Sequence, residues 1–295
     1  MSHPQQPVHE VLQSRPFEVG DGTEVRRLIP QRQLRTVGAW CFADHYGPDD
    51  VGTRGGMQVP PHPHTGLQTV SWLLEGEIVH RDSLGSLQRV GPRELSLMTS
   101  GDAISHSEES PEDRPRMLHG VQLWVALPES RRHGVPAYEH HTHLPEVAHG
   151  ELTATVILGT HAGITSPGST YSPLVGLEVA GDGSLPLEPT WEHAAFALEG
   201  PAQIDEGRVE VGELVQLGLG REELQVAGRV MVLGGRPLEE QLVLWWNFVC
   251  RSNDEVVQAR EDWETSSGRF GTVVGYPGPA LSAPPLGPVR LMPRS

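Results

Sequence analysis

Short apolar runs separated by glycine and proline turns recur along most of the chain, and they limit the folds that it can adopt. One pair of runs is Thr69–Leu74 and Ile78–His80, with Gly76 between them. Runs this short that contain Val, Ile and Leu are typical of strands, and 34 glycines and 26 prolines supply the turns. The pattern predicts an all-β chain, and 295 residues are ample for two domains of ordinary size.

Two short motifs on this strand pattern carry possible metal ligands. His62 and His64 stand two residues apart, and His106 and Glu108 have the same spacing. If both segments are strands, each pair projects from one face of its sheet, so the two faces can close on one ion. Three imidazoles and one carboxylate suit a divalent transition metal and leave positions open for a substrate or oxygen. The pattern predicts a catalytic metal site.

Chance is the competing explanation, because the chain contains 15 histidines. A single His-x-His pair is weak on that ground, and its combination with His-x-Glu after a predicted hairpin is stronger. Pro60, Pro61 and Pro63 fix the backbone next to the first pair and reduce the entropy lost in presenting its imidazoles. Two other histidines are not expected to be ligands. We expect a hydrogen-bonded structural role for His45, and for His80 a surface position is favoured over a supporting position behind the site.

The motifs and their flanking segments resemble the signature of the pirin family, within the cupin superfamily. The likeness begins with the segments around the two pairs, which are His62–His64, Leu74–Gly76, His80–Gly85, Met98–Thr99 and His106–Glu108. It continues toward both ends, in Asp44–Pro48, Gly120–Trp124, Tyr171–Leu174, Leu198–Gly200, Gly234–Leu238 and Asn247–Val249. The resemblance therefore extends over both halves of the chain and implies two tandem cupin-type β-barrels, a bicupin.

We expect three parts in the chain. Residues 1–132 would form an N-terminal metal-binding cupin barrel, 133–150 a linker, and 151–295 a C-terminal cupin barrel without a metal site, followed by a helix and a tail. The helix is predicted over Asp254–Trp263, which has an amphipathic pattern. Irregular spacing favours a solvated crossing over a second metal site for the histidines near the linker, which are His133, His140, His141, His143 and His149.

The resemblance also implies a ligand set and a reaction. Pirin-like proteins hold a metal in the N-terminal barrel, and His62, His64, His106 and Glu108 match its ligands. Fe(II) is the favoured ion, and Ni, Cu, Zn and Mn are compatible with these donors. Some members are quercetin 2,3-dioxygenases, which implies a flavonol-like aromatic substrate and O2, with Glu108 as both ligand and catalytic base.

Two alternative functions remain open at this point. Other pirin-like members are described as metal-dependent regulators, so the chain could be a non-enzymatic, redox-dependent protein that binds a protein partner. In a third case the metal would serve mainly to stabilise the barrel. Loss of melting temperature on chelation without any turnover would identify that case.

The chain departs from the family pattern close to the predicted ligands. It has Thr65, Leu67 and Gln68 where the family usually has Arg, Phe and Glu, and Asp102-Ala103 where the family usually has Arg-Gly. The neutral amide of Gln68 argues against a fifth protein ligand. The loss of arginine and the gain of Asp102 would make the entrance less attractive to an anionic flavonolate.

Charge and targeting signals narrow the remaining possibilities. With 22 basic against 38 acidic side chains, the net charge is -16, so direct binding to nucleic acid is not expected. Cys41 and Cys250 are expected to be buried free thiols. The segment Met1–Pro7 has no leader pattern, and no apolar run reaches the roughly 18 residues of a membrane span. We expect a cytoplasmic protein that does not bind membranes.

Overall fold

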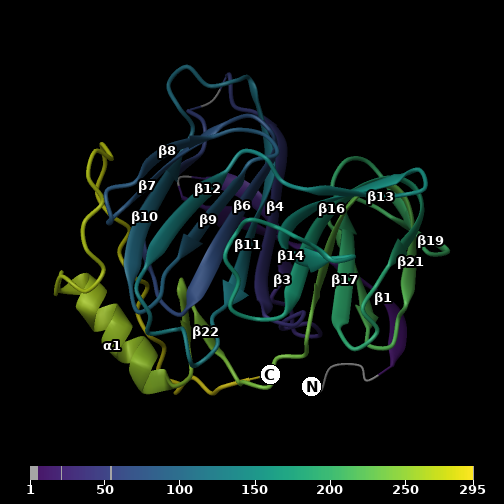
Figure 1. Ribbon diagram of the computed structural model, residues 1–295. Helices are drawn as coiled ribbons and strands as arrows, with labels where there is room; N and C mark the ends of the chain where they lie inside the picture. Colours follow the sequence, from purple (N-terminus) through teal and green to yellow (C-terminus); the bar gives the residue numbers. More distant parts are fainter. Residues whose placement is uncertain (1–5, 21, 54, 295) are drawn as a thin grey trace. The chain divides into compact units, whose positions relative to one another are not determined.

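The computed structural model describes residues 6–20, 22–53 and 55–294. Within these residues the chain forms 23 strands and the helix α1 (Asn253–Glu264) (Figure 1). The prediction of an all-β chain with a short C-terminal helix is confirmed. The hydroxyl of Ser252 caps α1 by accepting a hydrogen bond from the backbone N–H of Glu255 at 3.2 Å.

Contacts divide the chain into two compact units, and neither is continuous in sequence. Unit 1 comprises the described residues of Met1–Phe17, Arg26–His45 and His141–Leu238. Unit 2 comprises the described residues of Glu18–Val25, Tyr46–His140 and Glu239–Ser295. The C-terminal segment with α1 therefore lies in unit 2, whereas the sequence had grouped it with residues 151–238. As a division into folding domains, 1–132, 133–150 and 151–295 stays a prediction.

Unit 1 is built on a sheet of ten strands. The order along its main path is β1 (Pro7–Gln13), β20 (Glu213–Gly218), β17 (Glu192–Ala197), β21 (Glu223–Gly235), β16 (Leu174–Pro186), β14 (Leu152–His161) and β13 (Glu146–His149). Off this path, β15 (Ile164–Thr165) pairs with β14, and β18 (Ala202–Ile204) pairs with β19 (Gly207–Val209) and β21. The core is apolar, because alternate residues such as Leu177, Val179, Val230 and Val232 face it and are buried.

Unit 2 contains the strands that matter for the site. One sheet has the order β5 (Gln58–His64), β10 (Ile104–Glu109), β7 (Ile78–Asp82) and β8 (Leu87–Val90). A second has the order β12 (Ala137–His141), β9 (Leu95–Thr99), β6 (Leu67–Glu75), β11 (Met117–Ala126), β4 (Trp40–Asp50), β3 (Thr23–Ile29) and β2 (Arg15–Val19). Residues of β2, β3 and β4 are divided between the two units. A short pair is formed by β22 (Val243–Trp245) and β23 (Phe248–Cys250).

Helix α1 packs on unit 2 through its apolar side. Val256 and Ala259 are fully buried in a cluster that also contains Ala103 and Phe248. Figure 1 shows α1 at the side of the unit where β10 lies. These contacts explain why residues 239–295 belong with residues 46–140, although residues 141–238 separate the two segments in sequence.

Two strands lie within the segment 133–150 that the sequence analysis expected to be a solvated crossing. β12 pairs with β9 in unit 2, and β13 pairs with β14 in unit 1. Each lies at the edge of its sheet, and every residue of β12 is half-buried. A half-buried edge strand needs little apolar alternation, so its sequence carries a weak strand signal.

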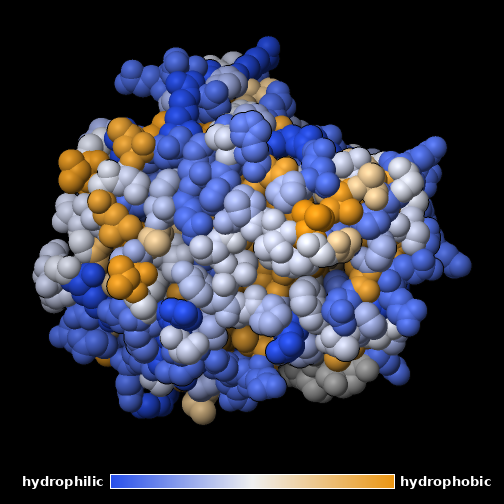
Figure 2. All heavy atoms as spheres, in the orientation of Figure 1, coloured by the Kyte–Doolittle hydropathy of each residue, from blue (hydrophilic) through white to orange (hydrophobic). Residues whose placement is uncertain are grey.

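The surface is mostly polar on the face drawn in Figure 2, where hydrophobic residues form small separate spots among hydrophilic ones. In the described part of the chain, every helix falls short of the length and hydropathy that a bilayer span requires. Cys41 and Cys250 are free and buried, as predicted.

Candidate metal centre

Strand β10 brings the predicted ligands together, because it pairs antiparallel with β5 on one side and with β7 on the other. His106 lies opposite His62 of β5 and opposite Asp82 of β7. Glu108 lies opposite His80 of β7. Side chains of directly opposed residues stand on the same face of a sheet, so one face of three strands carries all of these polar groups.

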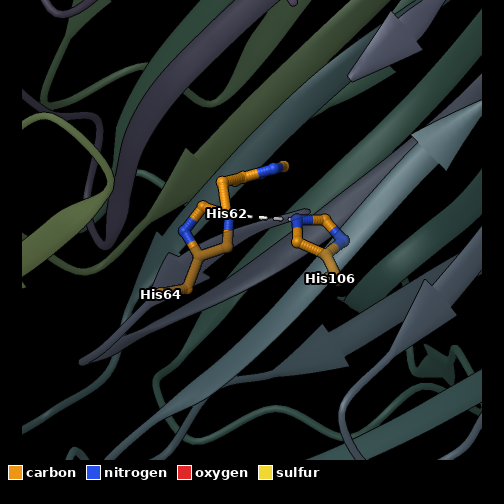
Figure 3. Close-up of side chains that lie close together, drawn as sticks. All are labelled: His62, His64 and His106. Atoms are coloured by element: carbon orange, nitrogen blue, oxygen red, sulfur yellow. Dashed lines mark hydrogen bonds between the residues drawn. The ribbon is translucent and has the colours of Figure 1, made fainter. Parts of the chain in front are cut away.

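Three imidazoles meet on this face (Figure 3). The ring centroids of His62 and His106 are 4.4 Å apart, and His64 lies 4.9 Å from each of the other two. One nitrogen from each ring can be chosen so that all three lie within 4.8 Å of one another. The three rings are buried, and Trp124 packs edge-on against His64 at 5.2 Å.

The backbone fixes which nitrogen is available in two of these rings. Nδ1 of His62 lies 2.8 Å from the carbonyl oxygen of Pro60, and Nδ1 of His64 lies 3.0 Å from that of Asn247. A carbonyl oxygen only accepts, so both Nδ1 atoms carry the proton and both Nε2 atoms have a free lone pair. Burial keeps the rings neutral, since it lowers the pKa of His62 to about 4 and that of His64 well below its usual value.

The spacing of the nitrogens fits a metal ion. Nε2 of His64 and Nε2 of His106 are 3.0 Å apart. Two nitrogens bound at about 2.1 Å to one ion and at right angles are separated by about 3.0 Å. Burial, together with the neighbouring imidazoles, also lowers the pKa of His106 well below its usual value, so this ring is a neutral donor. Neutral buried imidazoles at this distance are donors that suit a divalent transition metal.

Glu108 is buried on the same face but is held to one side of the three rings. Its Oε1 accepts a hydrogen bond from Oγ of Ser71 at 2.8 Å. A shift in register between His106 and Glu108 on the β5 side changes the residue that it faces there to Val59. Its carboxylate forms a second group of possible ligands with His80 and His106. The two groups share His106, and the four-ligand set of the sequence analysis stays a prediction.

Burial raises the pKa of the Glu108 carboxyl, whereas His80 and the hydrogen bond from Ser71 act in the opposite direction. The net shift is upward. A carboxylate with a raised pKa is a stronger base than an exposed one, which suits a group that must take a proton near neutral pH. Glu108 is therefore a candidate base as well as a candidate ligand.

The expectation that His80 lies at the surface is wrong. Its exposed fraction is 1%, its Nδ1 lies 3.4 Å from Nδ1 of His106, and its Nε2 lies 3.2 Å from Oδ2 of Asp82. The sequence does contain a signal that could have identified it. His80 and Asp82 form a third pair at strand spacing, and alternate residues of β7 are buried.

Backbone hydrogen bonds hold the carboxylate of Asp82 in place next to His80. Its Oδ1 accepts the backbone N–H groups of Leu84 at 2.9 Å and Ser86 at 3.0 Å. Burial raises the pKa of Asp82, but the hydrogen bonds from His80 and Ser86 outweigh it and hold this pKa below its usual value. Asp82 is thus a carboxylate, although it is almost completely buried.

The residues that depart from the family pattern have clear surroundings. Gln68 is fully buried, and its amide nitrogen donates to Oγ1 of Thr99 at 2.9 Å. Asp102 accepts a hydrogen bond from Nδ1 of His133 at 3.0 Å and pairs with Arg269 at 3.4 Å. The arginine offsets the charge of Asp102, so the predicted repulsion of an anionic substrate is weakened.

A cavity of about 420 Å³ lies against the other face of β5 and β10. Pro61 and Ser105 contribute to its wall from the two strands, and Trp263, Phe270 and Tyr276 do so from the C-terminal segment. Pro61 and Ser105 immediately precede His62 and His106, and successive side chains of a strand point to opposite faces. The cavity and the imidazoles thus lie on opposite sides of the same strands.

Comparison with known proteins gives the family. The family model described as Pirin matches residues 22–125, and the model described as Pirin C-terminal cupin domain matches residues 175–271. A Pseudomonas aeruginosa protein named "Putative quercetin 2,3-dioxygenase" is 44% identical, over 92% of this chain and 89% of its own length. The protein named Pirin from Homo sapiens is 30% identical, over 87% of this chain and 92% of its own length.

A solved structure agrees with these sequence matches. The crystal structure titled quercetin 2,3-dioxygenase from Acinetobacter baumannii has a TM-score of 0.92 and 40% identity to this chain. The match covers 96% of this chain and 97% of that one. The chain belongs to the pirin family and has two tandem cupin-type barrels, as the resemblance of its sequence implied.

Proposed function

We propose that this protein is a metal-dependent oxidoreductase of the quercetin 2,3-dioxygenase type, with His62, His64, His106 and Glu108 as metal ligands. The observation that carries the proposal is the group of three buried imidazoles, in which two Nε2 atoms are 3.0 Å apart. Its substrate class is supported by relatives at 44% and 40% identity whose names contain this activity. The substrates would be a flavonol-like aromatic molecule and O2.

We propose Fe(II) as the ion. Three neutral nitrogens with one carboxylate oxygen form a donor set of intermediate softness, which also accepts Ni, Cu, Zn or Mn. When bound, the ion would supply Lewis-acid polarisation of the flavonol 3-hydroxyl and a place for O2 beside it. The residues of the chain would hold the ion, take the proton of the substrate and exclude water.

Glu108 is proposed as the base that takes the proton of the flavonol 3-hydroxyl. The hydrogen bond from Ser71 fixes Oε1, so the orientation of the carboxylate is set before a substrate enters. Its raised pKa means that it holds the proton more firmly than an exposed glutamate would. Trp124, packed on His64, keeps water from that side of the rings.

The test is anaerobic reconstitution of the apo-protein with Fe(II), followed by oxygen uptake and ultraviolet spectra with quercetin. We expect turnover that depends on added metal and is lost in His62→Ala and in Glu108→Ala. His193→Ala is the matched control, because His193 is also a buried histidine but lies on β17 of unit 1. It should retain the activity.

Stoichiometric binding of metal without oxygen uptake would contradict the dioxygenase proposal. It would favour the alternative, a non-enzymatic regulator that binds a protein partner and responds to the oxidation state of its metal. Retention of full activity in Glu108→Ala would leave the dioxygenase activity in place and remove the proposed role of Glu108 as base.

A further inference from the structure

We propose that Asp82 and His80 set the tautomer of His106, so that Nε2 of His106 is a metal ligand and not a hydrogen-bond donor. Both are positioning residues, since they act through His106. The inference rests on the proposed metal site, but its first test needs no metal.

The geometry forms a chain of three side chains on neighbouring strands. Oδ2 of Asp82 lies 3.2 Å from Nε2 of His80, and Nδ1 of His80 lies 3.4 Å from Nδ1 of His106. At its other end, Nε2 of His106 lies 3.0 Å from Nε2 of His64. The register of β7 on β10 sets these distances, because His106 is opposite Asp82 and Glu108 is opposite His80.

Each proton in this chain has one consistent place. The carboxylate of Asp82 only accepts, so Nε2 of His80 donates to it and carries the proton. When His80 is neutral, its ring has a single N–H, so its Nδ1 has a lone pair and accepts from Nδ1–H of His106. The same rule leaves the lone pair of His106 on Nε2, where it faces His64.

The opposite tautomer of His106 would close the site. Its Nε2–H would then donate to the lone pair of His64 at 3.0 Å, and one hydrogen bond would occupy two of the three donor nitrogens. The acceptor on His80 competes with that bond. Asp82 and His80 therefore determine whether Nε2 of His106 has a free lone pair for a metal or donates a hydrogen bond to His64.

The plane of His80 is also fixed. Tyr138 of β12 stacks on its ring at a centroid distance of 4.1 Å and an interplanar angle of 8°. The hydroxyl of Tyr138 lies 3.0 Å from Oγ of Ser96, which holds the stacked ring in place. A surface histidine would need no such support. Partners of a ligating histidine typically change metal affinity by about 10- to 100-fold when they are removed.

Asp82→Asn is the sharpest variant, because it preserves shape and reverses the proton chain. The amide oxygen must face the backbone N–H groups of Leu84 and Ser86, which places the NH2 group toward Nε2 of His80. His80 then accepts at Nε2 and donates from Nδ1, and His106 must carry its proton on Nε2. The change of tautomer reaches His106 although only Asp82 is altered.

The first experiment is long-range ¹⁵N–¹H NMR of the apo-protein at pH 7.5, which distinguishes Nδ1–H from Nε2–H in each neutral imidazole. We expect Nδ1–H on His106 in the wild type and Nε2–H in Asp82→Asn. Asp44→Asn is the matched control, because Asp44 is another buried carboxylate, paired with Arg27 in unit 1. It should leave the signals of His106 unchanged.

The second experiment measures the Kd for Co(II) by competition with a chelator. We expect binding about 10- to 100-fold weaker in Asp82→Asn than in the wild type or Asp44→Asn. His80→Asn is a second variant, because its side-chain oxygen takes the place of Nδ1 as acceptor. It should bind Co(II) more tightly than His80→Leu, which offers no acceptor.

An Nε2–H on His106 of the wild type, or an unchanged tautomer in Asp82→Asn, overturns the inference. Equal Kd values for Co(II) in Asp82→Asn and the wild type also overturn it. If the wild type binds no Co(II), the proposed metal site fails and this inference fails with it. If Co(II) binds as expected but quercetin is not consumed, only the proposed activity fails.

Discussion

The two units contain the same kind of antiparallel sheet but bury different groups. In unit 1 the core consists of Val, Leu, Ile and Ala side chains, and the buried His193 stands on β17 outside any ligand group. In unit 2 one sheet face carries His62, His64 and His106, and one ring nitrogen of each lies within 4.8 Å of the others. Among the described residues, both groups of three or more possible ligands lie in unit 2.

The difference shows how paired strands bring several possible metal ligands together. One buried histidine costs stability and gives one donor, whereas pairs at i and i+2 on paired strands give several donors in one place. The short repeat Leu73–Gly76 in unit 2 and Ala197–Gly200 in unit 1 is alike in both halves and holds no ligand. The candidate metal site therefore depends on β5, β7 and β10 and not on the architecture that both units share.

The largest effect that we expect is a loss of stability from a substitution in the core of unit 1, without a change in metal affinity. Leu177 is fully buried in that core, so Leu177→Ala should lower the free energy of unfolding by about 2–5 kcal/mol. Urea denaturation measures this loss. The Kd for Co(II) should remain that of the wild type, and Leu87→Ala, at a residue with 63% exposure, should change neither quantity. A weakened metal site in Leu177→Ala would contradict the separation.

A pH effect follows from the buried histidine of unit 1. Burial lowers the pKa of His193 from 6.5 to about 4. As pH falls from 6.5 toward 4, the unfolded chain binds a proton at this position and the folded chain does not. The free energy of unfolding should decrease over this window by up to about 3 kcal/mol, because each pKa unit is worth about 1.4 kcal/mol.

The contribution of His193 is measured as a difference between two denaturation series. Apo-protein and His193→Gln are unfolded with urea at several pH values, and the glutamine variant should lose less stability between pH 6.5 and 4. Other buried histidines titrate in both proteins and cancel. Identical pH dependence in the two proteins would refute the assignment to His193.

Metal should stabilise the protein through unit 2. An ion that binds only the folded state at 100 times its Kd raises the free energy of unfolding by about 2.7 kcal/mol. We expect this gain with Co(II) in the wild type and in His193→Leu, and its absence in His106→Leu. Thermal melts with and without metal test it. Equal stabilisation of His106→Leu would mean that the ion binds elsewhere.

Much of this arrangement could be predicted from local sequence. The spacing of His62/His64 and of His106/Glu108 was interpreted on the condition that both segments are strands, which they are, and the expected helix Asp254–Trp263 differs from α1 by one residue at each end. The strand positions and the helix bounds each depend on the spacing of residues within one short segment, and this spacing can be read from the sequence. Resemblance to a family added the tandem barrels, which strand patterns alone could not specify.

The remaining features depend on which segments meet. The burial of His80 follows from the register of β7 on β10, and that register cannot be read from β7 alone. The position of Glu108 beside His80 depends on the same register, and the irregular register between β5 and β10 determines that Val59 faces Glu108 on the other side. Unit 2 includes residues 239–295 because α1 packs on Phe248 and Ala103, which is a tertiary contact.

The smallest effect concerns Asp102, where an acidic residue replaces the arginine of the family pattern. Asp102→Asn removes a half-exposed carboxylate that Arg269 partly neutralises. The electrostatic repulsion of an approaching anion should therefore decrease only slightly. We expect KM for quercetin to fall by at most about fivefold, with kcat unchanged.

Ionic strength distinguishes this charge effect from a change of shape. The fall in KM should shrink at 1 M salt, because the screening length is then only about 3 Å. Asp113→Asn is the control, since Asp113 is exposed and paired with Arg89 and should leave KM unchanged. A higher KM in Asp102→Asn, or an effect that salt does not weaken, would mean that Asp102 acts by holding Arg269 and His133 in place. The effect of Asp102→Asn would then come from a change of structure, and the charge at position 102 would not influence the binding of an anionic substrate.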